Sequence, residues 1–227
     1  MHNGIAIALA WPETLCKQAG AWYDKPLKWL EINKSNYYKV GHAAIVLINK
    51  KTGVCHYFDF GRYHSPYQHG RVRSADTDHD LEMKTRAKVS EDGRLKNYNE
   101  ILLELFNNES CHGSGKLHAS YCDVNFQQAF YKAIEMQSIS PIPYGPFLPN
   151  GTNCSRFVNT IILSGKPSWY YRLVLASPKT ISPTPIGNVK ALSNYSTVGI
   201  RIHTVELLKP RFKTANTISY ESSKCVS

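Results

Sequence analysis

Apolar residues form short runs of strand length in the first quarter of the chain. Residues 4–10 read Gly-Ile-Ala-Ile-Ala-Leu-Ala, and the Trp-Pro pair that follows ends the run, because a residue before proline avoids helical geometry. Residues 41–48 and 54–60 are two further β-rich runs, separated by a polar Asn-Lys-Lys-Thr-Gly turn. This pattern predicts a buried strand, then an aromatic-rich stretch over 13–40 of undecided structure, then a β-hairpin.

The apolar spacing changes to that of helices later in the chain. Apolar side chains recur every three or four residues over 97–108 and over 124–138. The same spacing returns from Cys154 and stops at the Gly-Lys-Pro sequence of residues 165–167. The sequence therefore predicts three helices, the third of which begins near Cys154.

The segments around these helices carry weaker signals. Residues 61–80 are rich in Gly, Pro, Arg, Asp and His and are typical of a long polar loop, whereas 81–94 favours a further strand. The prolines and glycines of 140–153 indicate an extended or turning segment. Short β-like pieces are expected at 170–176 and 198–205.

Composition and charge set the class of protein. The chain has 227 residues, of which 42% are apolar, so it has a globular composition, and we expect one domain over 1–215 with loop insertions and a disordered tail at 216–227. No apolar run approaches the roughly 18 residues of a membrane span. The 27 Lys and Arg against 17 Asp and Glu give a net charge of +10. The six cysteines are scattered, which favours mostly free thiols.

Three residues form a candidate catalytic set. Cys154 lies at the start of a predicted helix, where unpaired backbone amides stabilise a thiolate. His42 opens the first strand of the hairpin, and centring that hairpin favours Asp59 as its cross-strand neighbour, with His56 as the alternative because a β-bulge would exchange the two. A thiol nucleophile needs an imidazole to exchange its proton and a third polar group to orient that imidazole.

These residues resemble a known family. Gly-His-Ala-Ala-Ile-Val-Leu-Ile from Gly41, Tyr-Phe-Asp-Phe-Gly from Tyr57 and Asn-Cys-Ser-Arg-Phe-Val from Asn153 are similar to the permuted NlpC/P60 superfamily, in its lecithin:retinol acyltransferase-like branch, where the histidine strand precedes the cysteine helix. The resemblance implies a papain-like α+β fold with an antiparallel sheet packed on the cysteine-bearing helix. It implies Cys154 as nucleophile, His42 as base, and Asp59 or His56 as the orienting residue.

The resemblance implies a cysteine peptidase or amidase that acts on peptidoglycan stem peptides or a related amide. The alternatives are a thioester-forming acyltransferase or lipid acyl hydrolase, and a non-catalytic module that binds a polyanion. Basic clusters at 71–73, 84–88 and 209–213 suit an anionic polymer as partner, with nucleic acid the less favoured one.

No cofactor or metal is predicted. Cys111, His112, His118 and Cys122 are close in sequence, but their spacing fits none of the usual zinc patterns. The N-terminus lacks the basic stretch of a secretory signal, so we expect synthesis in the cytoplasm. An enzyme directed at the cell wall would then act on recycled fragments, be released by lysis or use a dedicated secretion apparatus.

Overall fold

The computed structural model describes residues 2–17, 33–34, 37–38, 41–145, 148, 150–177 and 182–199. Most of the aromatic-rich stretch over 13–40, the basic cluster at 209–213 and the predicted tail at 216–227 lie outside the described residues. Within the described part of the chain, no helix is long and apolar enough to cross a membrane.

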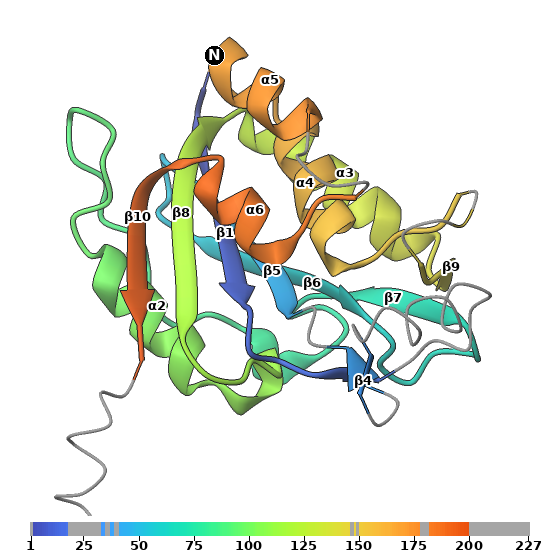
Figure 1. Cartoon of the computed structure of the whole chain (residues 1–227). Helices are drawn as coiled ribbons and strands as arrows, with labels where there is room; N and C mark the ends of the chain where they lie inside the picture. The colour runs from blue at the N-terminus through green and yellow to red at the C-terminus, as the bar shows by residue number, and fades with distance from the viewer. Residues whose placement is uncertain are drawn as a thin grey trace, which may run out of the picture.

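A seven-stranded sheet organises the fold, and each strand is antiparallel to its neighbours (Figure 1). A three-stranded sheet is formed by β2 (Cys16–Lys17), β4 (Tyr37–Tyr38) and β3 (Asn33–Lys34). In spatial order, the strands of the large sheet are β10 (Ser193–Val198), β8 (Leu117–Val124), β1 (Gly4–Trp11), β5 (His42–Asn49), β6 (Cys55–Gly61), β7 (His69–Arg73) and β9 (Ile142–Pro143).

Both faces of the sheet are covered, so the central strands are buried throughout. The side chains of β1 alternate between two cores: its alanines face one, and Ile5, Ile7, Leu9 and Trp11 face the other. Helices α3 (Phe126–Ser138), α4 (Cys154–Ser164) and α6 (Pro185–Lys190) pack on the alanine face, whereas α2 (Tyr98–Asn107) packs on the opposite face (Figure 1). The small alanine side chains allow the helices to approach the sheet closely.

The predicted hairpin and the three predicted helices are confirmed. The hairpin is β5–β6, and its register pairs Ala44 with Asp59 and Leu47 with His56. Asp59 is therefore the diagonal rather than the direct neighbour of His42, and the two side chains lie on the same face of the sheet. His56 faces the opposite side. The α+β class with an antiparallel sheet is also confirmed, because α4 packs directly on β5 and β6.

Three local predictions were wrong. Residues 69–73, placed in a polar loop, form β7, which pairs with β6 and β9. Residues 81–94 form no strand, although Val89 makes an isolated β-bridge with Leu95. A short 3-10 helix ends at Leu81, where the predicted strand would begin. Residues 170–176 are helical: α5 (Trp169–Ala176) carries β-favouring residues but buries only one stripe, centred on Leu175. Strand β7 and helix α5 form through contacts with distant segments, which local sequence preferences do not reveal.

The remaining C-terminal prediction and the cysteines are partly described. Strand β10 ends at Val198, where the predicted piece begins, and most of that piece lies outside the described residues. Four cysteines are free thiols, as the sequence predicts: Cys55, Cys111, Cys122 and Cys154.

Candidate active site

His42 is held at the first position of β5 by its neighbours. Gly41 precedes it with φ of +75°, a conformation that L side chains rarely adopt. A Cβ on Gly41 would lie 2.9 Å from the Cα of Pro12 and from the Trp11 carbonyl oxygen. Trp11, paired with His42 across β1 and β5, stacks on the imidazole with ring centroids 5.9 Å apart. The backbone turn and the indole together fix the position of the imidazole.

Cys154 is the first residue of α4. The side chain of Asn153 caps the helix by accepting a hydrogen bond from the Arg156 amide at 2.8 Å. The Cys154 sulfur is buried, forms a hydrogen bond with His42 and accepts one from the backbone amide of Ala43. The strand that begins with the imidazole therefore also supplies an amide to the sulfur.

Asp59 lies on the other side of the imidazole from the sulfur. His42 Nε2 is 3.3 Å from Asp59 Oδ2, which leaves Nδ1 of the ring for the thiol. Asp59 is fully buried and also accepts a hydrogen bond from the Tyr57 hydroxyl at 3.0 Å. The structure thus brings Cys154, His42 and Asp59 into one hydrogen-bonded chain, although Cys154 lies more than a hundred residues away from the hairpin.

The pKa shifts in this chain favour a charge-separated pair. Burial lowers the pKa of His42, but hydrogen bonds to Asp59 and Cys154 outweigh it and raise the pKa to about 9. Burial raises the pKa of Cys154, but its hydrogen bond to His42 and the imidazolium charge bring the pKa below the usual value for a thiol. Burial likewise opposes ionisation of Asp59, and hydrogen bonds to His42 and Arg73 overcome it, so its pKa is lowered. Both shifts favour the thiolate–imidazolium form of the pair over the neutral form.

The other described cysteines behave in the opposite way. Burial raises the pKa of Cys55 to about 11 and those of Cys111 and Cys122 to about 12. None of them has a pKa lowered by a neighbouring histidine. Among the cysteines whose side chains the structure describes, Cys154 alone has the properties of an activated nucleophile.

His56, the alternative orienting residue, is not near His42. Its ring packs against Phe130, with centroids 4.9 Å apart, and against Phe126, at 5.8 Å. Burial lowers the pKa of His56. The structure therefore leaves Asp59 as the acceptor for His42, and His56 belongs to the contact between β6 and α3.

Arg73, which the sequence analysis placed in a basic cluster, and Tyr63 complete the surroundings of the site. Arg73 donates two hydrogen bonds to Asp59, and its guanidinium carbon lies 3.6 Å from the centre of the Tyr63 ring. The Tyr63 ring in turn lies perpendicular to the His42 ring, with centroids 6.4 Å apart. The alternation along Arg-Val-Arg is a signal that places Arg73 on one face of a strand, but the segment was interpreted as loop.

The basic cluster at 71–73 is held by internal ion pairs, and the metal-competent residues are not grouped. Arg71 forms a bidentate pair with Asp78 and Arg73 pairs with Asp59, so the cluster at 71–73 is not an open cationic surface. Cys111 and Cys122 belong to cores on opposite faces of the sheet. In the described part of the chain, no three His, Cys, Asp or Glu side chains are grouped to hold a metal ion.

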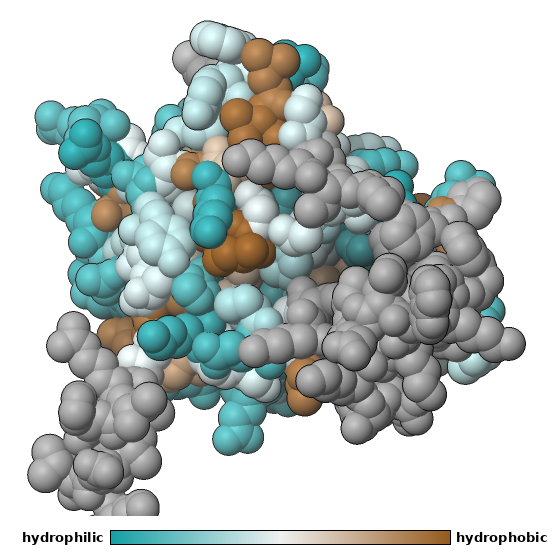
Figure 2. Space-filling view, viewed as in Figure 1, coloured by the Kyte–Doolittle hydropathy of each residue, from teal (hydrophilic) through white to brown (hydrophobic). Residues whose placement is uncertain are grey.

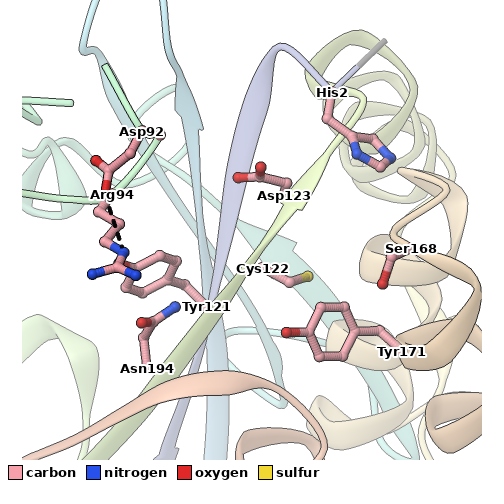
Figure 3. A pocket seen from close by; sticks show the side chains of 10 residues that line it. His2, Asp92, Arg94, Tyr121, Cys122, Asp123, Ser168, Tyr171 and Asn194 are labelled. Carbon is pink, nitrogen blue, oxygen red and sulfur yellow. Dashed lines mark ion pairs between the residues drawn. The ribbon is translucent and has the colours of Figure 1, made fainter. Parts of the chain in front are cut away.

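A cavity of about 280 Å³ lies away from this site, beside β8 (Figure 3). Asp123, Arg94 and Tyr171 are among its lining side chains, which come from β8, the loop around residue 94 and α5. Asp123 pairs with Ile5 near the start of β1, whereas His42 pairs with Trp11 at its end. Ile5 and Trp11 are six residues apart along β1, which corresponds to about 20 Å between the cavity and His42. The cavity is therefore distinct from the candidate active site.

Comparison with known proteins agrees with this picture of the fold. The crystal structure of the type VI secretion system effector TseH superposes with a TM-score of 0.52 at 19% sequence identity, over 83% of this chain and 87% of TseH. No curated protein matches the chain. The family model described as type VI secretion system effector TseH-like matches residues 6–169, which include His42, Asp59 and Cys154. The chain therefore belongs to the TseH-like family of type VI secretion system effectors.

Proposed function

We propose that this protein is a cysteine hydrolase that cleaves an amide bond, with Cys154 as nucleophile, His42 as general acid and base, and Asp59 as the residue that orients His42. The observation that carries the proposal is the hydrogen-bonded chain from the Cys154 sulfur through the imidazole to the Asp59 carboxylate. Thiol catalysis requires these three roles in this order.

In the first half of the reaction, the Cys154 thiolate attacks the carbonyl carbon of the substrate and a carbon–sulfur bond forms. The carbonyl oxygen becomes an oxyanion. The backbone amide of Cys154 lies in the first turn of α4, where amides have no partner within the helix, and it is the hydrogen-bond donor that we propose for this oxyanion. The His42 imidazolium then gives its proton to the leaving amine as the carbon–nitrogen bond breaks. A thioester and a free amine result.

In the second half, water hydrolyses the thioester. The neutral imidazole of His42 takes a proton from the attacking water, which adds to the thioester carbon. The carbon–sulfur bond breaks, the thiolate leaves and the acid product forms. Asp59 keeps the ring oriented and stabilises the imidazolium, since its buried carboxylate is hydrogen-bonded to Nε2.

The substrate that we propose is an amide bond in the peptide stems of peptidoglycan. Support comes from the resemblance of the His42 strand and the Cys154 helix to the permuted NlpC/P60 superfamily, in which the histidine strand comes first. Family membership supports delivery by a type VI secretion apparatus. The net charge of +10 suits an anionic cell wall.

The test is to incubate the full chain with purified peptidoglycan sacculi and to identify the released fragments by mass spectrometry. The expected result is a new free amine and carboxylate at one stem-peptide bond, abolished by Cys154→Ala. The matched control is Cys122→Ala, which removes a buried thiol on the same core but away from the imidazole. Equal activity of Cys154→Ala and the unchanged chain would overturn the proposal.

The acyltransferase alternative uses the same thioester and differs only in the acceptor. The identity of the product separates the two: a free carboxylate means transfer to water, whereas an ester or a new amide means transfer to an alcohol or amine. A polyanion-binding module without turnover would give no product, and its binding would be unaffected by Cys154→Ala.

A further inference from the structure

Helix α5 presents large apolar side chains to solvent. Trp169 is 72% exposed and Leu173 is 59% exposed, and Tyr170 and Val174 are exposed beside them. These four residues, the α5 face, lie on one side of the helix because they are spaced at i, i+1, i+4 and i+5. On the opposite side, Leu175 is buried in the core and Tyr171 is partly buried against it. In Figure 2, brown apolar residues reach the surface at the top of the molecule, where α5 lies in Figure 1.

The chain segment that contains α5 carries charge of one sign, and the acidic residues beside α5, Asp92 and Asp123, lie across the cavity on its Tyr171 side. Between Glu135 and Glu206 the sequence contains no Asp or Glu, but it contains six Lys and Arg. Two of these cations, Lys166 and Arg172, are exposed and lie just before and within α5. An apolar patch flanked by cations, with no acidic residue in the same segment, is complementary to a surface that is apolar inside and anionic outside.

We propose that the α5 face docks the protein on the surface of a bilayer that contains anionic lipids. The aliphatic and aromatic side chains enter the boundary between headgroups and acyl chains, where Trp and Tyr are favoured. Lys166 and Arg172 remain at the level of the phosphates. Helix α5 lies along the surface and does not cross the membrane, since its eight residues are too few to span it.

The composition of the face favours lipid over the other anionic polymers. Single-stranded nucleic acids are bound by flat aromatic platforms on which bases stack, together with a cationic groove. The α5 face instead mixes two rings with Leu173 and Val174, which offer no stacking surface. Aliphatic side chains gain most from an environment of acyl chains.

Docking through α5 would place the candidate active site close to the membrane. Helix α5 packs against α4, whose first residue is Cys154. Asn159, five residues after Cys154 in α4, donates a hydrogen bond to the Leu175 carbonyl of α5, so the nucleophile lies about 8 Å along α4 from this contact. This inference goes beyond the proposed reaction and does not depend on it, because no catalytic step involves α5.

The test is co-sedimentation of the full chain with vesicles of phosphatidylcholine alone or of phosphatidylcholine mixed in equal parts with phosphatidylglycerol. We expect binding to the anionic vesicles that weakens as salt is added. Trp169→Ala/Leu173→Ala should reduce the binding constant by about tenfold or more, and Arg172→Glu should reduce it by a similar factor. Running the same series in the Cys154→Ala chain keeps the result separate from any catalytic activity.

Matched controls use exposed residues elsewhere. Tyr67→Ala/Leu103→Ala removes comparable exposed apolar surface from the loop before β7 and from α2, and Lys84→Glu makes the same charge change as Arg172→Glu. These variants should bind anionic vesicles nearly as well as the unchanged chain. Circular dichroism establishes that every variant is folded.

Three results would overturn the proposal. The first is an unchanged chain that fails to bind anionic vesicles. The second is a folded Trp169→Ala/Leu173→Ala chain that binds as tightly as its control. The third is equal binding to both kinds of vesicle, which would remove the role of the cations. Binding of the α5 face to sacculi or single-stranded DNA, with none to vesicles, would assign it to another partner.

Discussion

Arg73 and Asp59 form a buried bidentate ion pair directly behind the candidate catalytic histidine. Arg73 Nε lies 2.9 Å from Asp59 Oδ1, and Arg73 Nη2 lies 2.5 Å from Asp59 Oδ2. The same Oδ2 accepts the hydrogen bond from His42. Arg73 therefore fixes the orientation of the Asp59 carboxylate. The negative charge of Asp59 interacts with both the Arg73 guanidinium and the His42 imidazole. Both oxygens of the Asp59 carboxylate are therefore hydrogen-bonded.

Arg73→Met should destabilise the protein far more than Arg71→Met. The two arginines lie two residues apart on β7 and each pairs with an aspartate, but the Arg73 pair is buried and the Arg71 pair is partly exposed. Removing one partner of a buried pair leaves an uncompensated charge and costs about 3–5 kcal/mol. An exposed pair contributes about 0–1 kcal/mol. Urea unfolding of both variants measures the difference, and equal losses would contradict a stabilising role for the buried pair.

Replacing Asp59 should shift the alkaline limb of the pH–rate profile to lower pH. Asp59 raises the pKa of His42 towards its value of about 9, and without the carboxylate burial lowers that pKa. The imidazolium is then lost at lower pH, and both the thiolate pair and the general acid are lost with it. The double variant Asp59→Asn/Arg73→Gln avoids an unpaired buried arginine. The measurement is the rate of hydrolysis by this variant between about pH 5 and pH 10. This range includes the usual pKa of histidine and the raised pKa of His42.

His56→Asn is the control for this shift. His56 was the alternative orienting residue, but its ring packs against Phe126 and Phe130. We expect the variant to keep the alkaline limb of the unchanged protein while losing some stability. An alkaline limb that moves with His56 and not with Asp59 would exchange the roles of the two residues.

Local sequence patterns predicted the parts of the site that short segments determine. The β5–β6 hairpin follows from two β-rich runs joined by a polar turn, and the start of α4 follows from an apolar helical period that begins at Cys154 after an N-capping Asn153. Because these two elements carry His42 and Cys154, the two main candidates were accessible from the sequence. Their meeting depends on α4 packing against β5, and the family resemblance was what indicated it.

Arg73 and α5 were missed because long-range contacts determine them. The pairing of β7 with β6 places Arg73 opposite Asp59, and nothing in residues 61–80 alone reveals that register. Helix α5 carries Trp, Tyr and Val, which favour strands, beside Leu and Ala, which favour helices, and it forms a helix with a single buried stripe. Intrinsic preference is a weak guide where tertiary packing chooses between two conformations.

Gly41→Ala should impair catalysis more than it impairs stability. The new Cβ meets the backbone of Trp11 and Pro12 at 2.9 Å, so the chain before His42 must move. A displacement of about 1 Å at a catalytic group costs roughly a hundredfold in rate. Gly93→Ala is the matched control, because Gly93 has a similar positive φ of +81° but its nearest neighbour is the Lys50 ammonium group at 3.4 Å. In both variants, an alanine at positive φ lowers the free energy of unfolding by about 1 kcal/mol. Equal loss of activity in the two would argue against a positioning role for Gly41.

The rate of alkylation by iodoacetamide should separate Cys154 from the other thiols. Cys154 and Cys55 are equally buried, at 6% exposure each, so a difference between their rates reports the thiolate rather than access. The pKa of Cys154 is lowered by His42, whereas that of Cys55 is raised to about 11. At pH 7 we expect Cys154 to react at least tenfold faster, as followed by mass spectrometry of peptides from a Cys16→Ser/Cys225→Ser chain.

The dependence on His42 completes this prediction. His42→Asn removes both the proton acceptor and the positive charge, so the alkylation of Cys154 at pH 7 should slow towards the rate of Cys55. Cys154 in this variant should recover reactivity only well above pH 9, the usual thiol pKa, because burial without the imidazolium raises the pKa of the thiol. A Cys154 that reacts equally fast at pH 7 with and without His42 would show that the imidazole does not activate the sulfur, and it would remove the physical basis for placing the two residues in one catalytic unit.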